Sequence, residues 1–317
     1  MHIFIKILKN RNFILLMALF LGLTFHDIAD AMKPALIPVL AVIMIFSISG
    51  ISFKSFTNLK QVASISATAI FLNFILYGII ILVLSHIIFD DPLLRAGFVV
   101  IAATPPGVAV IPFSVSFKGN LKFALTGILG TYTAAIFLSP LIISLFTGKD
   151  SLDITKLLFT ILWIVVVPLI LSRFLRHKKV YPSVEKIRGK VIDIGFAIII
   201  YVSVGLNKEV LFNNPEIFMY SALIFFITMF VAGILFSFFT ANVLSNASAV
   251  SYNLMYAIKS SGFAAATSIA LFEDKAAIPA AVLSIFMLLY LLIADLWLPA
   301  KSRLHKYIFW KKVSESE

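Results

Sequence analysis

The stretch FVVIAATPPGVAVIPFSVSF at residues 98–117 decides the fold class of this chain. It is apolar at both ends, and its middle contains Pro105, Pro106, Gly107 and Pro112. Proline removes a backbone hydrogen-bond donor and clashes with the preceding turn, so this run predicts a helix that is interrupted near its centre. Such interruptions are tolerated in membrane helices, where neighbouring helices satisfy the freed backbone groups.

A second stretch, NLMYAIKSSGFAAATSIALF at residues 253–272, has a comparable interruption. Its middle contains Lys259, Ser260, Ser261 and Gly262. Small residues and a charge weaken a helix here, although less forcefully than proline does. When Gly107 is aligned with Gly262, Thr104 falls opposite Lys259. Proline and glycine are common in membrane helices, so one such stretch would mean little, but two matching stretches predict a repeated element.

The composition predicts an all-α polytopic membrane protein. Of the 317 residues, 61% are hydrophobic and only 13% are charged, which is too few charges to cover a soluble globule of this size. Each predicted span is long enough to cross the hydrocarbon core of a bilayer. Ten apolar runs predict ten spans, at 12–27, 34–53, 62–88, 94–117, 121–147, 155–175, 188–206, 216–243, 248–272 and 276–299.

The Lys and Arg distribution predicts the orientation of these spans. With the N-terminus inside, 19 of the 26 basic residues lie on the inner side, 6 lie on the outer side, and Lys259 lies within a span. Cytoplasmic loops carry an excess of Lys and Arg, so we expect a cell-membrane protein with both termini in the cytoplasm and residues 148–154 outside. The basic 173–190 loop suits a surface of anionic lipid, although a plain topology signal explains it equally well.

The interrupted spans are the fourth and the ninth, which is the fourth of five in each half of the chain. Because five is odd, two such halves run through the membrane in opposite directions. We therefore expect one transport unit made of two inverted five-helix repeats, residues 1–150 and 151–317. Inverted repeats with discontinuous helices that meet at the midplane are typical of secondary transporters.

Several other functions are disfavoured by the residues present. The net charge of +11 does not indicate nucleic acid, because the basic residues lie between apolar runs. The chain has no cysteine, which excludes thiolate metal sites and thiol catalysis, and its five histidines show no metal-ligand spacing. We expect no cofactor, no metal and no enzymatic activity.

The chain resembles the bile acid:sodium symporters, whose superfamily includes arsenite, auxin-type and riboflavin-type carriers. The resemblance rests on TPPGVAVIPFSVSFKGN at 104–120, on KSSGFAAA at 259–266, and on Asn73, which takes the place of a third-span glutamine. It implies ten spans in two repeats, broken fourth and ninth helices, and a core that moves against a panel of spans one, two, six and seven.

The resemblance also implies two sodium sites, and this chain departs from them. The positions that carry sodium ligands in bacterial family members fall here on Val110, Ile111, Ala124, Ile128, Met255 and Lys259. Apolar side chains offer sodium no oxygen, and hard cations need several oxygen ligands. The chain thus resembles a divergent member of the family in which the usual sodium ligands are missing.

Lys259 is the predicted working residue. A lysine in mid-membrane costs about 2.5–3.5 kcal/mol on insertion scales, so it is kept only beside a cavity or polar partners. Snorkelling to the surface is disfavoured, because Lys259 lies far from both ends of its span. We expect Asn73, Thr104, Ser260 and Ser261 around it, and half-helices that begin at Val108 and Phe263 and add positive potential.

These observations predict a secondary transporter of a small organic anion or zwitterion, independent of sodium and with protons as the candidate coupling ion at Lys259. The residues assigned to substrate and coupling are Asn73, Thr104, Pro105, Pro106, Gly107, Lys259, Ser260, Ser261 and Gly262. Two alternatives remain open: a sodium symporter with a relocated ion site, and a membrane receptor that uses the same fold without transport. The sequence does not name the solute, the direction of transport or the oligomeric state.

Overall fold

The computed structural model describes residues 11–25, 27–50, 58–107, 109–148, 166–206 and 215–298, with 155, 159, 163, 208 and 212 as isolated residues. The described residues form helices joined by short turns. Both chain ends and residues 149–154, which bear on the predicted orientation, lie outside them. Within the predicted sixth span, 155–175, residues 156–158, 160–162, 164 and 165 also lie outside them.

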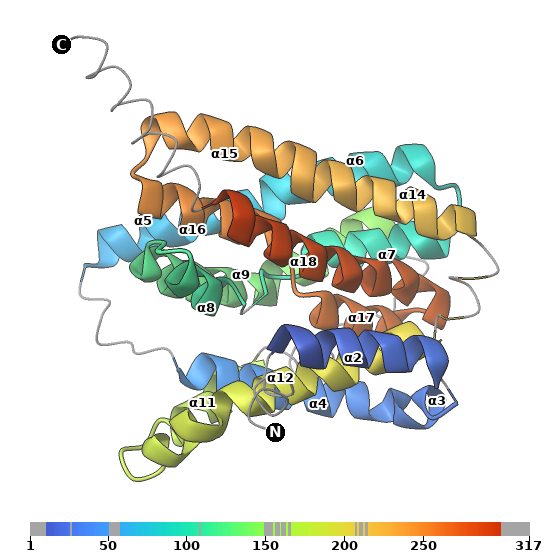
Figure 1. Cartoon of the computed structure of the whole chain (residues 1–317), viewed down its shortest axis with the longest axis horizontal. Helices are drawn as coiled ribbons and strands as arrows, with labels where there is room; N and C mark the ends of the chain where they lie inside the picture. Colours follow the sequence, from blue (N-terminus) through green and yellow to red (C-terminus); the bar gives the residue numbers. More distant parts are fainter. Residues whose placement is uncertain are drawn as a thin grey trace.

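One group of helices forms a layer that we call the panel, the lower layer in Figure 1. Within it α12 packs on α2, α3 and α4, and α11 packs on α4. The panel consists of α2 (Arg11–Thr24), α3 (Ala29–Met32), η1 (Lys33–Ala35), α4 (Leu36–Ser49), α11 (Val167–Leu175) and α12 (Tyr181–Leu206).

The remaining helices form a larger body that we call the core bundle. Its first part consists of α5 (Leu59–Ile70), η3 (Phe71–Leu76), α6 (Tyr77–Ile88), α7 (Pro92–Ala103), α8 (Val110–Ser116) and α9 (Leu121–Thr147). Its second part consists of α14 (Pro215–Phe225), η6 (Phe226–Val231), α15 (Ala232–Val243), α16 (Asn246–Ala257), α17 (Ser261–Leu271), η7 (Asp274–Ala277) and α18 (Ile278–Trp297).

In the part of the chain that the structure describes, six helical stretches are long and apolar enough to cross a membrane, which confirms an all-helical polytopic membrane protein. They are Ala29–Ser49, Leu59–Ile88, Leu121–Thr147, Tyr181–Leu206, Pro215–Thr240 and Asp274–Leu291. Three shorter apolar helices cover Phe13–Thr24, Pro92–Ala103 and Ser261–Leu271. The last two belong to the predicted fourth and ninth spans, which are short here because each span is divided.

Local sequence explains where the helices of the core bundle begin. The side chains of Asn58, Asn120 and Ser260 each accept a hydrogen bond from a backbone N–H in the first turn of α5, α9 and α17. Asp91 does the same for α7, and Pro92 occupies the first helical position, where a missing N–H costs nothing. Short polar side chains thus fix where these four helices begin.

Two π-helical turns occur at corresponding places in the core bundle. η3 covers residues 71–76 and η6 covers residues 226–231, and the difference between positions 71 and 226 is 155 residues. The helices that follow keep the same spacing, because α6 covers 77–88 and α15 covers 232–243. A π-turn breaks the regular i to i−4 bonding of the helix, and such turns are frequent at functional sites.

Gly97 lets α7 lie directly against η7. A Cβ atom at this position would lie 2.2 Å from the backbone oxygen of Ala276 and 3.0 Å from Cγ of Pro279. We expect Gly97→Ala to lower the free energy of unfolding by about 3 kcal/mol or more, because a backbone atom cannot rotate away. Gly78→Ala is the matched control, since its Cβ would meet only Cβ of Ala102 at 3.9 Å. Equal melting temperatures for the two purified variants would contradict this packing.

Candidate functional site

The two predicted interruptions are present, and they face each other. α7 ends at Ala103 and α8 begins at Val110, while α16 ends at Ala257 and α17 begins at Ser261. The extended segments between these helices pair in antiparallel fashion through Pro106 and Lys259. The Gly107 N–H donates to the Ile258 carbonyl at 3.1 Å, and the Ser260 N–H donates to the Pro105 carbonyl at 3.3 Å. Each segment therefore replaces part of the helical bonding that the other lacks.

Glycine at position 107 is required by this close approach. A Cβ atom there would lie 3.0 Å from the backbone oxygen of Lys259 and 3.1 Å from Cγ2 of Ile258. Any larger residue would push the two extended segments apart. The residues of this segment therefore explain the crossing. Pro105 and Pro106 end the helix, and Gly107 leaves room for the second segment.

Every carbonyl from residue 102 to residue 107 has a hydrogen-bond donor. Two of these donors are hydroxyl groups on one face of α9, those of Tyr132 and Ser139. Interrupting a helix leaves carbonyls without their usual partners, and inside a membrane water cannot replace them. The donors are Lys259 Nζ to Ala102 and Thr104, Ser139 to Ala103, Ser260 N–H to Pro105, Tyr132 to Pro106, and Val110 N–H to Gly107.

The ammonium of Lys259 lies at the centre of this arrangement. Its side chain is fully buried. Nζ lies 2.6 Å from the Thr104 carbonyl, 3.1 Å from the Ala102 carbonyl, 2.9 Å from Oδ1 of Asn73 and 3.3 Å from the Asn73 carbonyl. These four oxygens, which we call the oxygen cage, are all uncharged. An ammonium has three donors, so the cage satisfies it completely.

Aromatic rings complete the surroundings of the ammonium. Nζ lies 5.2 Å from the ring centroids of both Phe74 and Tyr77, which is within cation–π range. The carbonyls of Ala102 and Thr104 belong to the C-terminal end of α7, where the helix dipole is negative. A positive charge is therefore stabilised at this point without any carboxylate among its recorded partners.

Asn73 contributes to the cage through both its backbone and its side chain. It lies within the π-turn η3, where the helix ladder is irregular and a carbonyl can turn toward another partner. Its side-chain amide also lies 3.5 Å from the Met255 carbonyl, so the same residue contacts α16 just before the second interruption. The π-turn thus supplies two of the four cage oxygens.

Comparison with protein families decides the affiliation of the chain. The sequence model of the SBF-like CPA transporter family (DUF4137) matches residues 11–296. The chain belongs to this family. The match agrees with the resemblance to bile acid:sodium symporters, and together with the membrane-length helices it makes the chain a membrane transporter. A search of curated proteins finds no match for the chain.

In this SBF-like transporter, the residues predicted at the former sodium positions lie among apolar neighbours. Val110, Ala124, Ile128 and Met255 are all fully buried. They belong to one continuous hydrophobic cluster that spans the core bundle and part of the panel, and Ile111 packs against it. A Cβ atom on Gly127 would lie 2.6 Å from the terminal methyl of Met255, which shows how closely α9 and α16 approach here.

The structure gives different roles to two residues predicted beside the Lys259 ammonium, Ser260 and Ser261, and defines how a third, Thr104, contacts it. Thr104 binds the ammonium through its carbonyl, whereas its hydroxyl donates to Ile101 of its own helix at 2.9 Å. Ser260 does not contact the ammonium, because its hydroxyl caps α17 by accepting from the Phe263 N–H at 3.4 Å. Ser261 is the first residue of α17, which therefore begins two residues before the predicted Phe263. The predicted start at Val108 lies outside the described residues, and α8 begins at Val110.

The hydroxyls of Tyr132 and Ser139 are site residues that the sequence reasoning missed. They lie seven positions apart on the fifth predicted span, which places them on the same helix face and two turns apart. Two hydroxyl residues at this spacing in an apolar run are a usable sequence signal, and the structure shows both to be buried. The core bundle also contains a second polar group, in which the Asn253 side chain binds the Gly233 carbonyl and Tyr290, and Tyr256 binds the Thr228 carbonyl.

Proposed function

We propose that this chain is a secondary active transporter of a small organic anion or zwitterion, working by alternating access and independently of sodium. In this proposal the ammonium of Lys259 takes the place of a coupling cation. The observation that carries it is the oxygen cage, in which a tethered positive charge is surrounded by neutral oxygens as a bound cation would be. The proposal includes no cofactor and no enzymatic step.

The proposal includes two inverted repeats of five spans, residues 1–150 and 151–317. The constant spacing of 155 residues between η3 and η6 and between α6 and α15 supports it. The same spacing separates Gly107 from Gly262, so the interruptions follow the same register. In such transporters, substrate sites lie where the discontinuous helices of the two repeats meet.

We place the protein in the cell membrane with both termini in the cytoplasm. The support is the excess of Lys and Arg on that side of the predicted spans. The 2.9 and 3.0 Å hydrogen bonds from Arg176 and Arg173 to the last carbonyls of α4 place two of these charges at a helix C-terminus, where they also stabilise the helix dipole.

The charges near the crossing support an anionic substrate in this proposal. Lys259 brings a positive charge, and the N-terminus of α17 adds a positive partial charge directly after it. Protons are the proposed coupling ion, because loss of the ammonium proton removes the charge that binds the cage. The contacts of the ammonium with the oxygen cage would then weaken, and the core bundle would be free to move relative to the panel.

The proposed function is tested by ligand binding followed by flux. Purified protein is screened for a rise in melting temperature with small organic anions, because a ligand that binds the folded state stabilises it by mass action. Anions that stabilise the protein are then offered as labelled solutes to proteoliposomes. We expect saturable uptake that needs no sodium. Binding without uptake would instead indicate a receptor and would overturn the proposal.

A further inference from the structure

Two ion pairs involve adjacent residues of η7, which lies at one end of the molecule. Asp274 lies 2.5 Å from Nζ of Lys33, which begins η1 in the panel. The next residue, Lys275, pairs with Asp91, which caps α7 in the core bundle. One pair therefore crosses from the panel to the core bundle, whereas the other joins two elements of the core bundle.

The pair within the core bundle ties two helices that lead to the Lys259 site. Oδ1 of Asp91 accepts from the N–H groups of Leu93 and Leu94 at 2.9 and 3.2 Å, and Oδ2 accepts from Lys275. Partial burial raises the pKa of the Asp91 carboxyl, but these hydrogen bonds outweigh it and lower the pKa below its usual value. Because α7 ends and α17 begins at the site, this pair joins the far ends of both half-helices into one unit.

The panel contacts this unit from the site to the end that carries η7. Beside the site, a Cβ on Gly262 would lie 3.3 Å from the side chain of Ile199 in α12. Farther along, Ala281 of α18 packs with Ile200 and Val204 of α12 in a small apolar cluster. Beyond these apolar contacts, Lys33–Asp274 is an ion pair that joins the panel to the core bundle.

We propose that the Lys33–Asp274 pair is a latch that holds the panel and the core bundle together at this end, and that it separates when the transporter opens there. The inference rests on the proposed alternating-access function. Both side chains are about two-fifths exposed, at 39% and 42%, so the pair is weak. A weak latch suits an equilibrium that must reverse in every transport cycle.

Accessibility of a single cysteine tests the latch without any substrate. The chain has no cysteine, so an introduced cysteine is the only thiol that the reagent can label. Ala266 lies one turn after Gly262 on the same face of α17 and is 1% exposed. A cysteine at this position, Ala266→Cys, therefore becomes accessible only if the panel and the core bundle separate between the Lys259 site and the Lys33–Asp274 pair. The labelling rate is measured with a membrane-impermeant maleimide added to intact cells. We expect Asp274→Asn and Lys33→Ala each to raise the rate about two- to fivefold, the range for an exposed ion pair.

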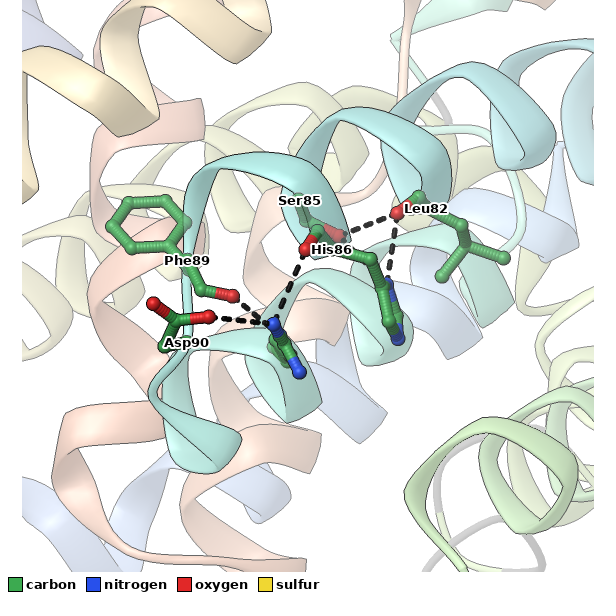
Figure 2. A network of polar contacts seen from close by, with 6 residues as sticks. Leu82, Ser85, His86, Phe89 and Asp90 are labelled. Carbon is green, nitrogen blue, oxygen red and sulfur yellow. Dashed lines mark hydrogen bonds and ion pairs between the residues drawn. The ribbon is translucent and has the colours of Figure 1, made fainter.

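Two controls separate a latch from a general loss of structure. The double charge exchange Lys33→Asp with Asp274→Lys should restore the slow rate. Asp90→Asn breaks another pair in the neighbouring α6–α7 turn, where Arg95 lies 3.2 Å from Asp90 and also binds the carbonyls of Phe89 and His86. The labelled residues of this network in Figure 2 lie at the end of α6 and in the turn after it, away from Lys33 and Asp274, so Asp90→Asn should leave the labelling rate unchanged.

The outcomes distinguish the latch from the proposed function. If the thiol is labelled at the same rate in all variants, or if the charge exchange fails to restore the slow rate, the latch is wrong and alternating access stands. If the thiol reacts in no variant, either in cells or in inverted vesicles, the panel and core bundle do not part here and both proposals fall.

Discussion

Lys259→Ala is expected to abolish coupled transport and to lower the stability of the protein strongly. The substitution leaves the carbonyls of Ala102 and Thr104 and both oxygens of Asn73 without the donor they share. An unsatisfied buried polar group costs about 1–3 kcal/mol, so four of them outweigh the gain from removing a buried charge. We expect a net loss of about 3 kcal/mol or more in the free energy of unfolding.

Lys259→Gln separates stability from coupling. An amide keeps two of the three donors and no charge, so it can satisfy part of the oxygen cage. We expect a smaller fall in melting temperature than for Lys259→Ala, together with the same loss of gradient-driven uptake. Lys60→Ala, an exposed lysine on α5, is the control and should leave both quantities unchanged. Gradient-driven uptake that survives in Lys259→Ala would remove Lys259 from the mechanism.

The rate of uptake by the unmodified protein is expected to be unaffected by a sodium gradient and to increase with a proton gradient. The side chains at the predicted sodium positions are apolar and tightly packed, with Val110, Ala124, Ile128 and Met255 fully buried. The ammonium would also repel a neighbouring cation. Two unit charges about 4 Å apart at an effective dielectric of about 20 cost about 4 kcal/mol, or about three decades in affinity.

The measurement compares uptake of an identified substrate into proteoliposomes under a sodium gradient, a proton gradient and neither. Lys259→Gln serves as the matched variant, and it should not gain sodium dependence, because the other ligands are still missing. If sodium alone stimulates uptake by the unmodified protein, the core bundle has a sodium site at another place and this prediction is wrong.

The interruptions could be predicted because their causes are local. A proline lacks its N–H wherever it stands, so Pro105 and Pro106 end α7 regardless of the surrounding fold. The all-helical membrane class follows from composition in the same way. The importance of Lys259 could also be predicted, since a charge in an apolar span requires partners whatever those partners are.

The Asn73 side chain was expected beside Lys259, but the other three cage oxygens could not be predicted from side chains. Two of the cage oxygens are the backbone carbonyls of Ala102 and Thr104, and a third is the backbone carbonyl of Asn73. Every residue has a carbonyl, and the sequence does not show which one is free. Ser260 and Ser261 looked better suited as partners, but the first caps α17 and the second begins it, because a helix start uses nearby hydroxyls.

By itself, the sequence of this protein determined the all-helical membrane class, the two interruptions and the residue that occupies their crossing. The first follows from composition, and the others follow from the local chemistry of proline, glycine and a buried charge. Only the tertiary structure decided which groups surround that charge. The reason is that a carbonyl becomes available only where a helix ends or a π-turn disturbs its ladder, and only packing brings such carbonyls from η3 and α7 to within about 3 Å of one lysine on another helix pair.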